Sequence, residues 1–109
     1  MVRLLFEGIK MDSINKLNEE LLQATKDGDL EVVKSLVDQG ADVNVKDKEN
    51  ATPLMRSVSR NYQAIVKLLI EQGAHVNAIN DWGYTPLKYA IKLNLKEMQQ
   101  MLKDAGATE

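Results

Sequence analysis

A five-residue string recurs with one change in this 109-residue chain, thirty-three residues apart. Gly-Ala-Asp-Val-Asn at residues 40–44 returns as Gly-Ala-His-Val-Asn at residues 73–77, and Thr-Pro-Leu at 52–54 returns at 85–87. The leading glycine occurs a third time at the same interval, as Gly106. A fixed period of this length is typical of a stack of equivalent units that each pack only on their neighbours. We therefore expect a repeat array rather than one closed globule.

Alignment on the glycines divides the chain into an N-terminal extension at residues 1–12 and three units at about 13–45, 46–78 and 79–109. Each unit has room for two helices and a turn. In the second and third units the first helix should begin at Thr-Pro-Leu. The threonine oxygen can cap the first turn there, and proline suits the first helical position. In the first unit the helix can extend back to Asp12 or Ser13.

The second helices are predicted at residues 30–39, 63–72 and 96–105, each ended by a glycine that tolerates a left-handed backbone. The turns between the two helices of a unit fall at Gly28, Asn61 and Asn94. Apolar residues at helical spacing predict the buried faces. In the first helices they are Leu54, Val58, Leu87 and Ile91, and in the second helices Val32, Val33, Leu36, Val37, Ile65, Val66, Leu68, Leu69, Ile70, Met98, Met101 and Leu102.

The ends of the array depart from the repeat. Glu19-Glu20 stands where Thr-Pro would be, and Gln99, Gln100 and Lys103 replace residues that are mostly apolar in the other units. Terminal units must turn a polar face to water, so we expect a cap at each end. Residues 1–10 are interpreted as a loose extension or an extra packing strand, with Met11 a second plausible start.

Composition excludes several classes of function. The chain has 14 basic and 16 acidic residues, no cysteine and a single histidine, His75. The balance of charge argues against nucleic-acid and membrane partners. The absence of cysteine excludes a disulfide framework, and a single histidine argues against a histidine-based metal site. The carboxylate pairs fall at predicted helix starts and turn tips rather than in a sheltered pocket. We predict no catalytic, cofactor-binding or metal-binding residues. No export signal is visible, so we expect a cytoplasmic location, with an injected or nuclear destination left open.

Gly40-Ala41-Asp42-Val43-Asn44 together with Thr52-Pro53-Leu54, at this period, resembles the ankyrin repeat. The family's signature Thr-Pro-Leu-His-x-Ala reads Thr-Pro-Leu-Met-Arg-Ser and Thr-Pro-Leu-Lys-Tyr-Ala here, so its histidine is absent. The resemblance implies an all-α solenoid of stacked antiparallel helix pairs with hairpin-like connecting loops. It also implies a non-enzymatic protein-binding module whose concave face is made of tips and first helices.

The family's variable contact positions can be carried over one by one. We interpret the resulting residues as partner-binding: Lys48, Glu49, Ser59 and Arg60 in the second unit, and Asp81, Trp82, Tyr84, Lys92 and Leu93 in the third, with Ala51 also at such a position and Lys26 and Asp27 as counterparts in the first.

Most of these residues have a second interpretation. Trp82 could instead fold back over the neighbouring tip or be covered by residues 1–10, and Tyr84 could pack locally. Arg60 and Lys92 could anchor an acidic partner or form solvated helix ends. Tyr62 and Tyr89 are expected to pack, as are Met98 and Met101, and His75 is expected in a surface loop.

The sequence thus favours an interaction module, monomeric alone, that binds another protein of unknown identity. The alternative is a structural protein that self-associates through an end unit or through the apolar patch Leu4, Leu5 and Phe6. A designed scaffold is disfavoured by the many departures from the signature, and nucleic-acid binding by the absence of a basic face.

Overall fold

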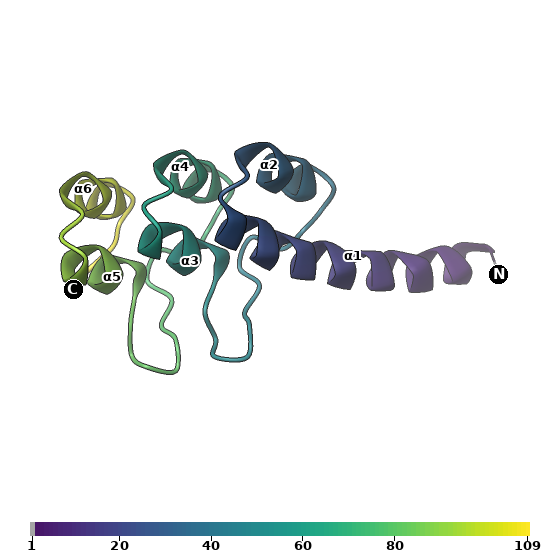
Figure 1. Cartoon of the computed structure of the whole chain (residues 1–109). Coiled ribbons are helices and arrows are strands. Elements are labelled where there is room, and N and C mark those ends of the chain that lie inside the picture. Colours follow the sequence, from purple (N-terminus) through teal and green to yellow (C-terminus); the bar gives the residue numbers. More distant parts are fainter. Residues whose placement is uncertain (1) are drawn as a thin grey trace.

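The computed structural model describes the backbone of residues 2–109 and the side chains of residues 13–109. The described residues form three antiparallel helix pairs and no strand (Figure 1), which confirms the all-α solenoid. The helices are α1 (Val2–Asp27), α2 (Leu30–Asp38), α3 (Pro53–Ser59), α4 (Gln63–Glu71), α5 (Pro86–Lys92) and α6 (Lys96–Asp104). In Figure 1, α1, α3 and α5 form one row and α2, α4 and α6 form a second row above it.

The first helix is much longer than predicted. It begins at Val2 rather than at Asp12 or Ser13, so the alternative of an extra packing strand at residues 1–10 is wrong. Residues 2–20 contain no proline and many residues of high helix propensity, which lets the helix run on. The predicted apolar patch at Leu4, Leu5 and Phe6 lies outside the residues whose side chains are described.

The first helices of the second and third units begin as predicted. Thr52 Oγ1 accepts a hydrogen bond from Met55 N at 3.3 Å, and Thr85 Oγ1 accepts one from Lys88 N at 3.1 Å. Pro53 and Pro86 occupy the first helical turn, where a missing N–H leaves no intrahelical bond unmade. These helices are therefore started by local chemistry that the sequence displays.

The second helices end one residue before their predicted ends, and each is followed by a left-handed glycine. Gly40, for example, has a φ of +107°, and Ala41 N donates to Leu36 O at 3.0 Å while Gly40 N donates to Val37 O at 3.0 Å. This pair of bonds satisfies two carbonyls that the helix end would leave open. The chain then turns sharply into the loop that leads to the next unit.

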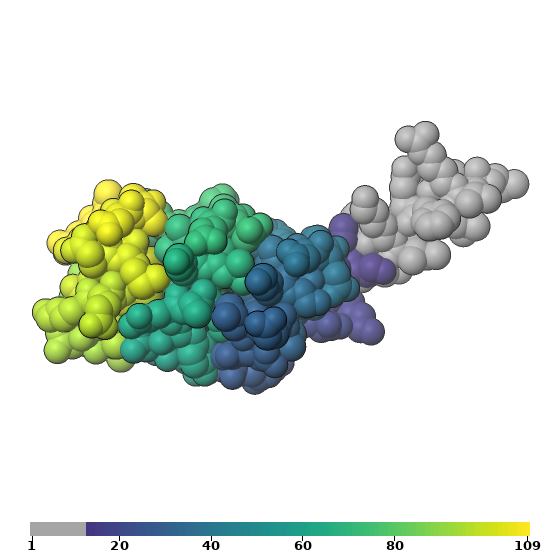
Figure 2. Space-filling model, turned by 90° about the horizontal axis from the view of Figure 1, so that it is seen from above, coloured from purple at the N-terminus to yellow at the C-terminus, as the bar shows by residue number. Residues whose placement is uncertain are grey.

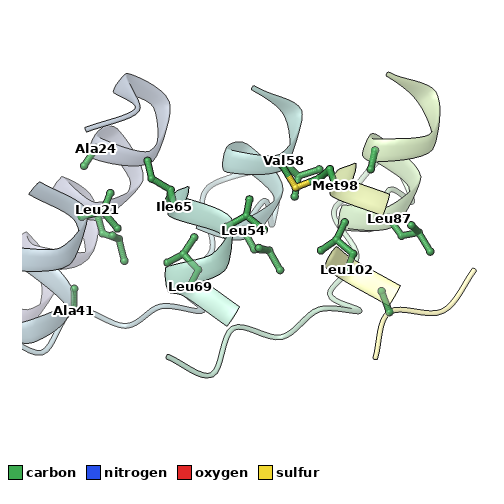
Figure 3. Close-up of a cluster of buried hydrophobic side chains, with 14 of the residues drawn as sticks. Leu21, Ala24, Ala41, Leu54, Val58, Ile65, Leu69, Leu87, Met98 and Leu102 are labelled. Carbon is green, nitrogen blue, oxygen red and sulfur yellow. The ribbon is translucent and has the colours of Figure 1, made fainter. Parts of the chain in front are cut away.

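The core runs through all three units along the inner sides of both helix rows (Figure 3). Leu21, Leu54 and Leu87 occupy equivalent positions and are all buried. The small residues predicted to allow close helix approach, Ala24, Ser57 and Ala90, are buried as well. Seen from the side of α2, α4 and α6, the units follow one another along the long axis (Figure 2).

Two predicted core residues are exposed. Ile91 is 42% exposed although its equivalent in the second unit, Val58, is fully buried, because a third unit covers Val58 and no further unit covers Ile91. Val32 is also 42% exposed, on the outer side of α2 next to the buried Val33. Helical spacing therefore identified the buried face of each helix, but not which residues at the border of that face are exposed to solvent.

Asparagine side chains hold consecutive units together. Asn44 Nδ2 donates to Gly73 O at 3.2 Å, and Asn44 Oδ1 accepts from His75 N at 2.7 Å. Asn77 makes the equivalent bonds to Gly106 O and Thr108 N, at 3.2 and 2.9 Å. Each side chain thus bonds the loop that follows the second helix of the next unit. His75 lies in that exposed loop, as predicted.

Candidate functional site

Two loops project from the helix rows as hairpin-like tips (Figure 1), here called tip two (residues 47–51) and tip three (residues 80–84). One side chain shapes each tip. Asp47 Oδ1 accepts hydrogen bonds from the backbone N–H groups of Glu49 and Ala51, both at 2.9 Å. Asn80 Oδ1, at the equivalent position in tip three, accepts from Trp82 N and Tyr84 N, both at 3.0 Å. A short polar side chain that bonds its own backbone in this way fixes a turn.

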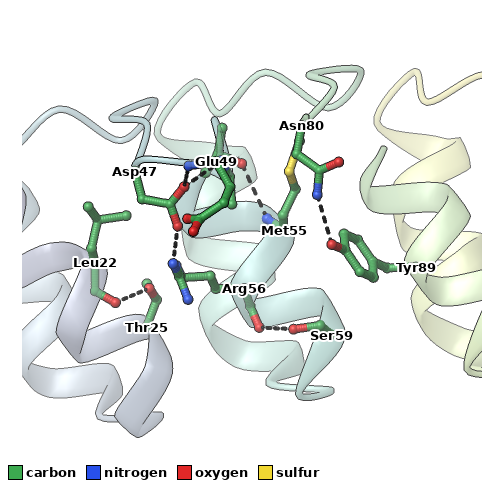
Figure 4. Close-up of polar contacts among 11 residues, drawn as sticks. Leu22, Thr25, Asp47, Glu49, Met55, Arg56, Ser59, Asn80 and Tyr89 are labelled. Atoms are coloured by element: carbon green, nitrogen blue, oxygen red, sulfur yellow. Dashed lines mark hydrogen bonds and ion pairs between the residues drawn. The ribbon is translucent and has the colours of Figure 1, made fainter. Parts of the chain in front are cut away.

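The second polar atom of each shaping residue reaches back to the first helix of its unit (Figure 4). Asp47 Oδ2 pairs with the Arg56 guanidinium from α3, and Asn80 Nδ2 donates to Tyr89 Oη from α5 at 2.8 Å. Asn80 is only 5% exposed, so its bond to Tyr89 is largely shielded from water. The tips are thereby anchored on the helices beneath them.

The two tips also bond each other. Asp81 N donates to Glu49 O at 2.9 Å, and Asn50 Nδ2 donates to Asp81 Oδ1 at 2.8 Å. Neighbouring tips therefore form one continuous edge of a surface whose other side is α1, α3 and α5. We call this surface, made of tips two and three and these three helices, the concave face.

Two hollows lie on the concave face, one on each side of the Asp47–Arg56 pair. The hollow between the second and third units has a volume of about 220 Å³ and is lined by Asp47, Glu49, Ala51, Met55, Arg56, Ser59, Asn80, Trp82 and Tyr89. The hollow between the first and second units has a volume of about 270 Å³ and is lined by Glu19, Leu22, Gln23, Lys26, Asp47, Lys48, Glu49 and Arg56.

Trp82 stands at the rim of the 220 Å³ hollow with 65% of its surface exposed. The alternative in which it folds back over the neighbouring tip is therefore wrong. Cover of Trp82 by residues 1–10, the other alternative, lies outside the residues whose side chains are described. Among residues 13–109, the Trp82 indole is the largest exposed apolar group.

Tyr84 packs locally, as its second interpretation proposed. Its ring lies 4.8 Å from the Tyr89 ring, and its hydroxyl is 3.0 Å from Lys92 Nζ. The hydrogen bond from Lys92 to Tyr84, helped by the charge of the same hydroxyl group, raises the pKa of Lys92 above its ordinary value. Lys92 is nevertheless fully solvated, so it is both a tether for Tyr84 and an exposed cation.

The remaining predicted contact residues are divided between the tips and the ends of the first helices. Lys48 and Asp81 are exposed on tips two and three, while Glu49 is half-buried between them. Ser59 is half-buried at the end of α3, and its Oγ donates to Arg56 O at 2.8 Å. Arg60 and Leu93 are exposed at the helix caps that follow α3 and α5.

The repeated geometry has a counterpart among known proteins. Comparison with protein families matches residues 21–108 to the ankyrin repeats, in three copies. The chain belongs to the ankyrin-repeat family. A search of curated proteins finds no individual relative that matches it.

The aromatic and methionine residues of this ankyrin-repeat chain pack between its units and against its core. Tyr62 lies directly before α4; its ring packs against Gly28, and its hydroxyl donates to Lys26 O at 3.2 Å. Tyr62, Tyr89 and Met101 are half-buried against the core and Met98 is fully buried, as predicted.

Arg56 and Asp47 are the residues of this ankyrin-repeat site that sequence reasoning missed. Arg56 and Tyr89 share one repeat position, as do Asp47 and Asn80, so comparing these two positions together would have suggested a bonded pair. Read separately, Arg56 is one more charged helix residue and Asp47 one more turn residue. Their pairing depends on how the tip returns to the helix.

Acid titration tests the role of Asp47. Burial alone would raise the pKa of this carboxyl, but hydrogen bonds from the Ala51 and Glu49 backbone, together with Arg56, outweigh it and hold the pKa below 3.8. A carboxylate whose pKa is lower folded than unfolded stabilises the fold above about pH 4, and that contribution is lost as the pH falls through the folded-state value. Asp47→Asn should therefore flatten the fall in unfolding free energy below pH 4.

At pH 7 the same variant should be less stable by about 1 kcal/mol, because the ion pair is lost while the turn-forming oxygen remains. Urea unfolding between pH 7 and pH 2.5 measures both effects. Asp38→Asn, at an exposed carboxylate in the last turn of α2, is the matched control. An acid limb in Asp47→Asn as steep as in the wild type would contradict the assignment.

Among the described residues, no helix combines the length and the apolar character that crossing a lipid bilayer requires.

Proposed function

We propose that this ankyrin-repeat chain is a protein–protein interaction module that binds its partner through the concave face. The exposure of Trp82 carries the proposal. Covering a large apolar side chain contributes about 1.5–3 kcal/mol, and tryptophan is among the residues that dominate interface energies. A tip that holds its indole in water beside a hollow suits a surface that a second protein covers.

The rigidity of the tips supports the same proposal. Asn80 fixes the backbone of Trp82 and Tyr84, and the two tips bond each other through Asp81 and Glu49. A binding surface that is already ordered before contact loses less conformational entropy when the partner arrives. The proposed contacts comprise the nine residues inferred from the sequence: Lys48, Glu49, Ser59, Arg60, Asp81, Trp82, Tyr84, Lys92 and Leu93.

Affinity capture from native lysate tests the concave face directly. Trp82→Ala should lower recovery of a partner about 30-fold, since the loss of a tryptophan hot spot costs about 2 kcal/mol or more. Val32→Ala serves as the control, because Val32 is an exposed apolar residue on α2, outside both hollows. Partners recovered equally by the wild type and by Trp82→Ala would argue against binding through this face.

Ile91 favours self-association through the third unit as a second candidate function. It is exposed at a position that the next unit covers in the middle of the stack, so a second copy could pack there. Ile91→Lys should then abolish any rise of the mass with protein concentration, measured by light scattering. A constant monomeric mass in the wild-type protein would rule this candidate out.

A further inference from the structure

Glu49 and Trp82 occupy the same position in successive tips, thirty-three residues apart. The tips are joined at this point, since Asp81 N bonds Glu49 O at 2.9 Å and Trp82 follows Asp81 directly. Both side chains line the 220 Å³ hollow between the second and third units. The repeat geometry thus places a carboxylate and an exposed indole on one rim, facing the same space.

The charges around this hollow do not cancel. Its charged lining residues are Asp47, Glu49 and Arg56, and Asp47 pairs with Arg56. The Arg56 Nε atom is buried and has no hydrogen-bond partner, so it is not offered to a ligand from outside. Within residues 13–109, no cationic side chain forms an ion pair with Glu49. One negative charge therefore remains at the rim.

We infer that this hollow receives an arginine or lysine side chain of the partner protein, with its cation against the Trp82 ring and paired with the Glu49 carboxylate. This inference rests on the proposed function and names the chemistry of the partner. A cation is attracted both to the face of an indole and to a carboxylate, and tryptophan is the aromatic residue that attracts cations most strongly. An acidic side chain would meet Glu49 with a like charge.

The rest of the lining suits the stem of such a side chain. Met55 is almost fully buried beneath the hollow, and Ala51 adds a second small apolar surface. Arginine and lysine place their methylene groups along apolar surface while the charged head stays near polar groups. An uncharged aliphatic side chain would fill the same volume but would desolvate Glu49 without giving it a counter-charge.

Trp82 is the only tryptophan of the chain, so indole fluorescence reports on this hollow alone. We would titrate the full-length protein with Nα-acetyl-arginine amide and Nα-acetyl-lysine amide, and compare Nα-acetyl-norleucine amide and Nα-acetyl-glutamate amide. The two basic probes should give a saturable change at about millimolar concentration, as expected for one side chain without its protein. The neutral and acidic probes should give none in that range.

Glu49→Gln should weaken binding of the basic probes at least about fivefold and remove most of its dependence on salt. Glu31→Gln, at an exposed carboxylate in the first turn of α2, should bind as the wild type does. Backbone amide spectra of each variant show that the fold is kept. Equal binding by wild type and Glu49→Gln, preference for norleucine or glutamate, or no saturation by either basic probe would overturn the inference.

These outcomes are separable from the failure of the proposed function. If the basic probes do not bind but Trp82→Ala still loses its captured partner, the concave face binds protein by other chemistry. If the probes bind as described but Trp82→Ala retains every partner, the hollow binds cations without being the partner's docking site.

Discussion

Gly28→Ala is expected to lower the free energy of unfolding by about 3 kcal/mol, because two costs add at this turn. Gly28 has a φ of +76°, a conformation that costs an alanine about 1–2 kcal/mol. A Cβ atom there would also lie 2.6 Å from Cζ of the Tyr62 ring, which belongs to the next unit. Pushing the ring aside in a packed interface costs about 1–3 kcal/mol more.

Gly83→Ala separates the two costs. Gly83 has nearly the same φ, +78°, but a Cβ atom there meets nothing within 4 Å. This control should lose only the conformational part, about 1–2 kcal/mol. Thermal and urea unfolding measure both variants, and the midpoint of Gly28→Ala should fall by roughly 10–20 °C. Equal losses at the two glycines would show that the Tyr62 ring yields freely.

The third unit suggests how the clash can be relieved. There the equivalent pair is Asn61 and Leu95, so a residue with a Cβ is accommodated beside a leucine. Adding Tyr62→Leu to Gly28→Ala should therefore restore part of the lost stability, and a double-mutant cycle should show a coupling of about 1–2 kcal/mol between the two sites. Additive losses would contradict a direct contact.

Asn80→Ala should lower the free energy of unfolding by about 2–3 kcal/mol, because it leaves three polar groups without a hydrogen-bond partner. The N–H groups of Trp82 and Tyr84 lose their shared acceptor, and the Tyr89 hydroxyl loses its donor. Since Asn80 is 5% exposed, water reaches this site poorly. Urea unfolding gives the energy, and amide hydrogen exchange at Trp82 and Tyr84 should speed up beyond the change in global stability.

Asn80→Asp is the matched control, since it places at tip three the residue that tip two already uses. Its carboxylate can still accept from both backbone N–H groups, and the Tyr89 hydroxyl can turn to donate to it. We expect a loss of about 1 kcal/mol or less. If Asp and Ala at residue 80 were equally destabilising, the turn-forming oxygen would not be what holds the tip.

The helices and their boundaries followed from the sequence because their signals are local. The Thr-Pro starts and the glycine stops act within one turn of chain, and the structure places them within a residue of the expected positions. The length of α1 was not predicted, because no residue pattern on its N-terminal side marks where the helix begins. The exposure of Ile91 did not follow either, since it depends on what lies beyond the last unit rather than on Ile91 itself.

The candidate site could be predicted only in outline. Repeat alignment placed Glu49 and Trp82 on successive tips, and the structure brings both to one hollow with Ser59. Read one residue at a time, the sequence did not give the Asp47–Arg56 pair, because that contact depends on the path by which a loop returns to α3. Nor could the sequence decide between exposure and packing for Trp82 and Tyr84. The two aromatic residues are two positions apart, yet Trp82 is exposed and Tyr84 packs against Tyr89.

In each tip, one set of residues fixes the loop conformation and another set faces outward. Asp47 and Asn80 determine the course of each loop from within, while residues 48, 49, 81 and 82 carry no turn-forming side-chain bond except the one from Asn50 to Asp81. Outward-facing positions of this kind can be substituted without changing the conformation of the loop. A combinatorial library that randomises these four positions and keeps residues 47, 56, 80 and 89 would therefore yield folded proteins of new specificity, with the Thr-Pro-Leu framework left intact.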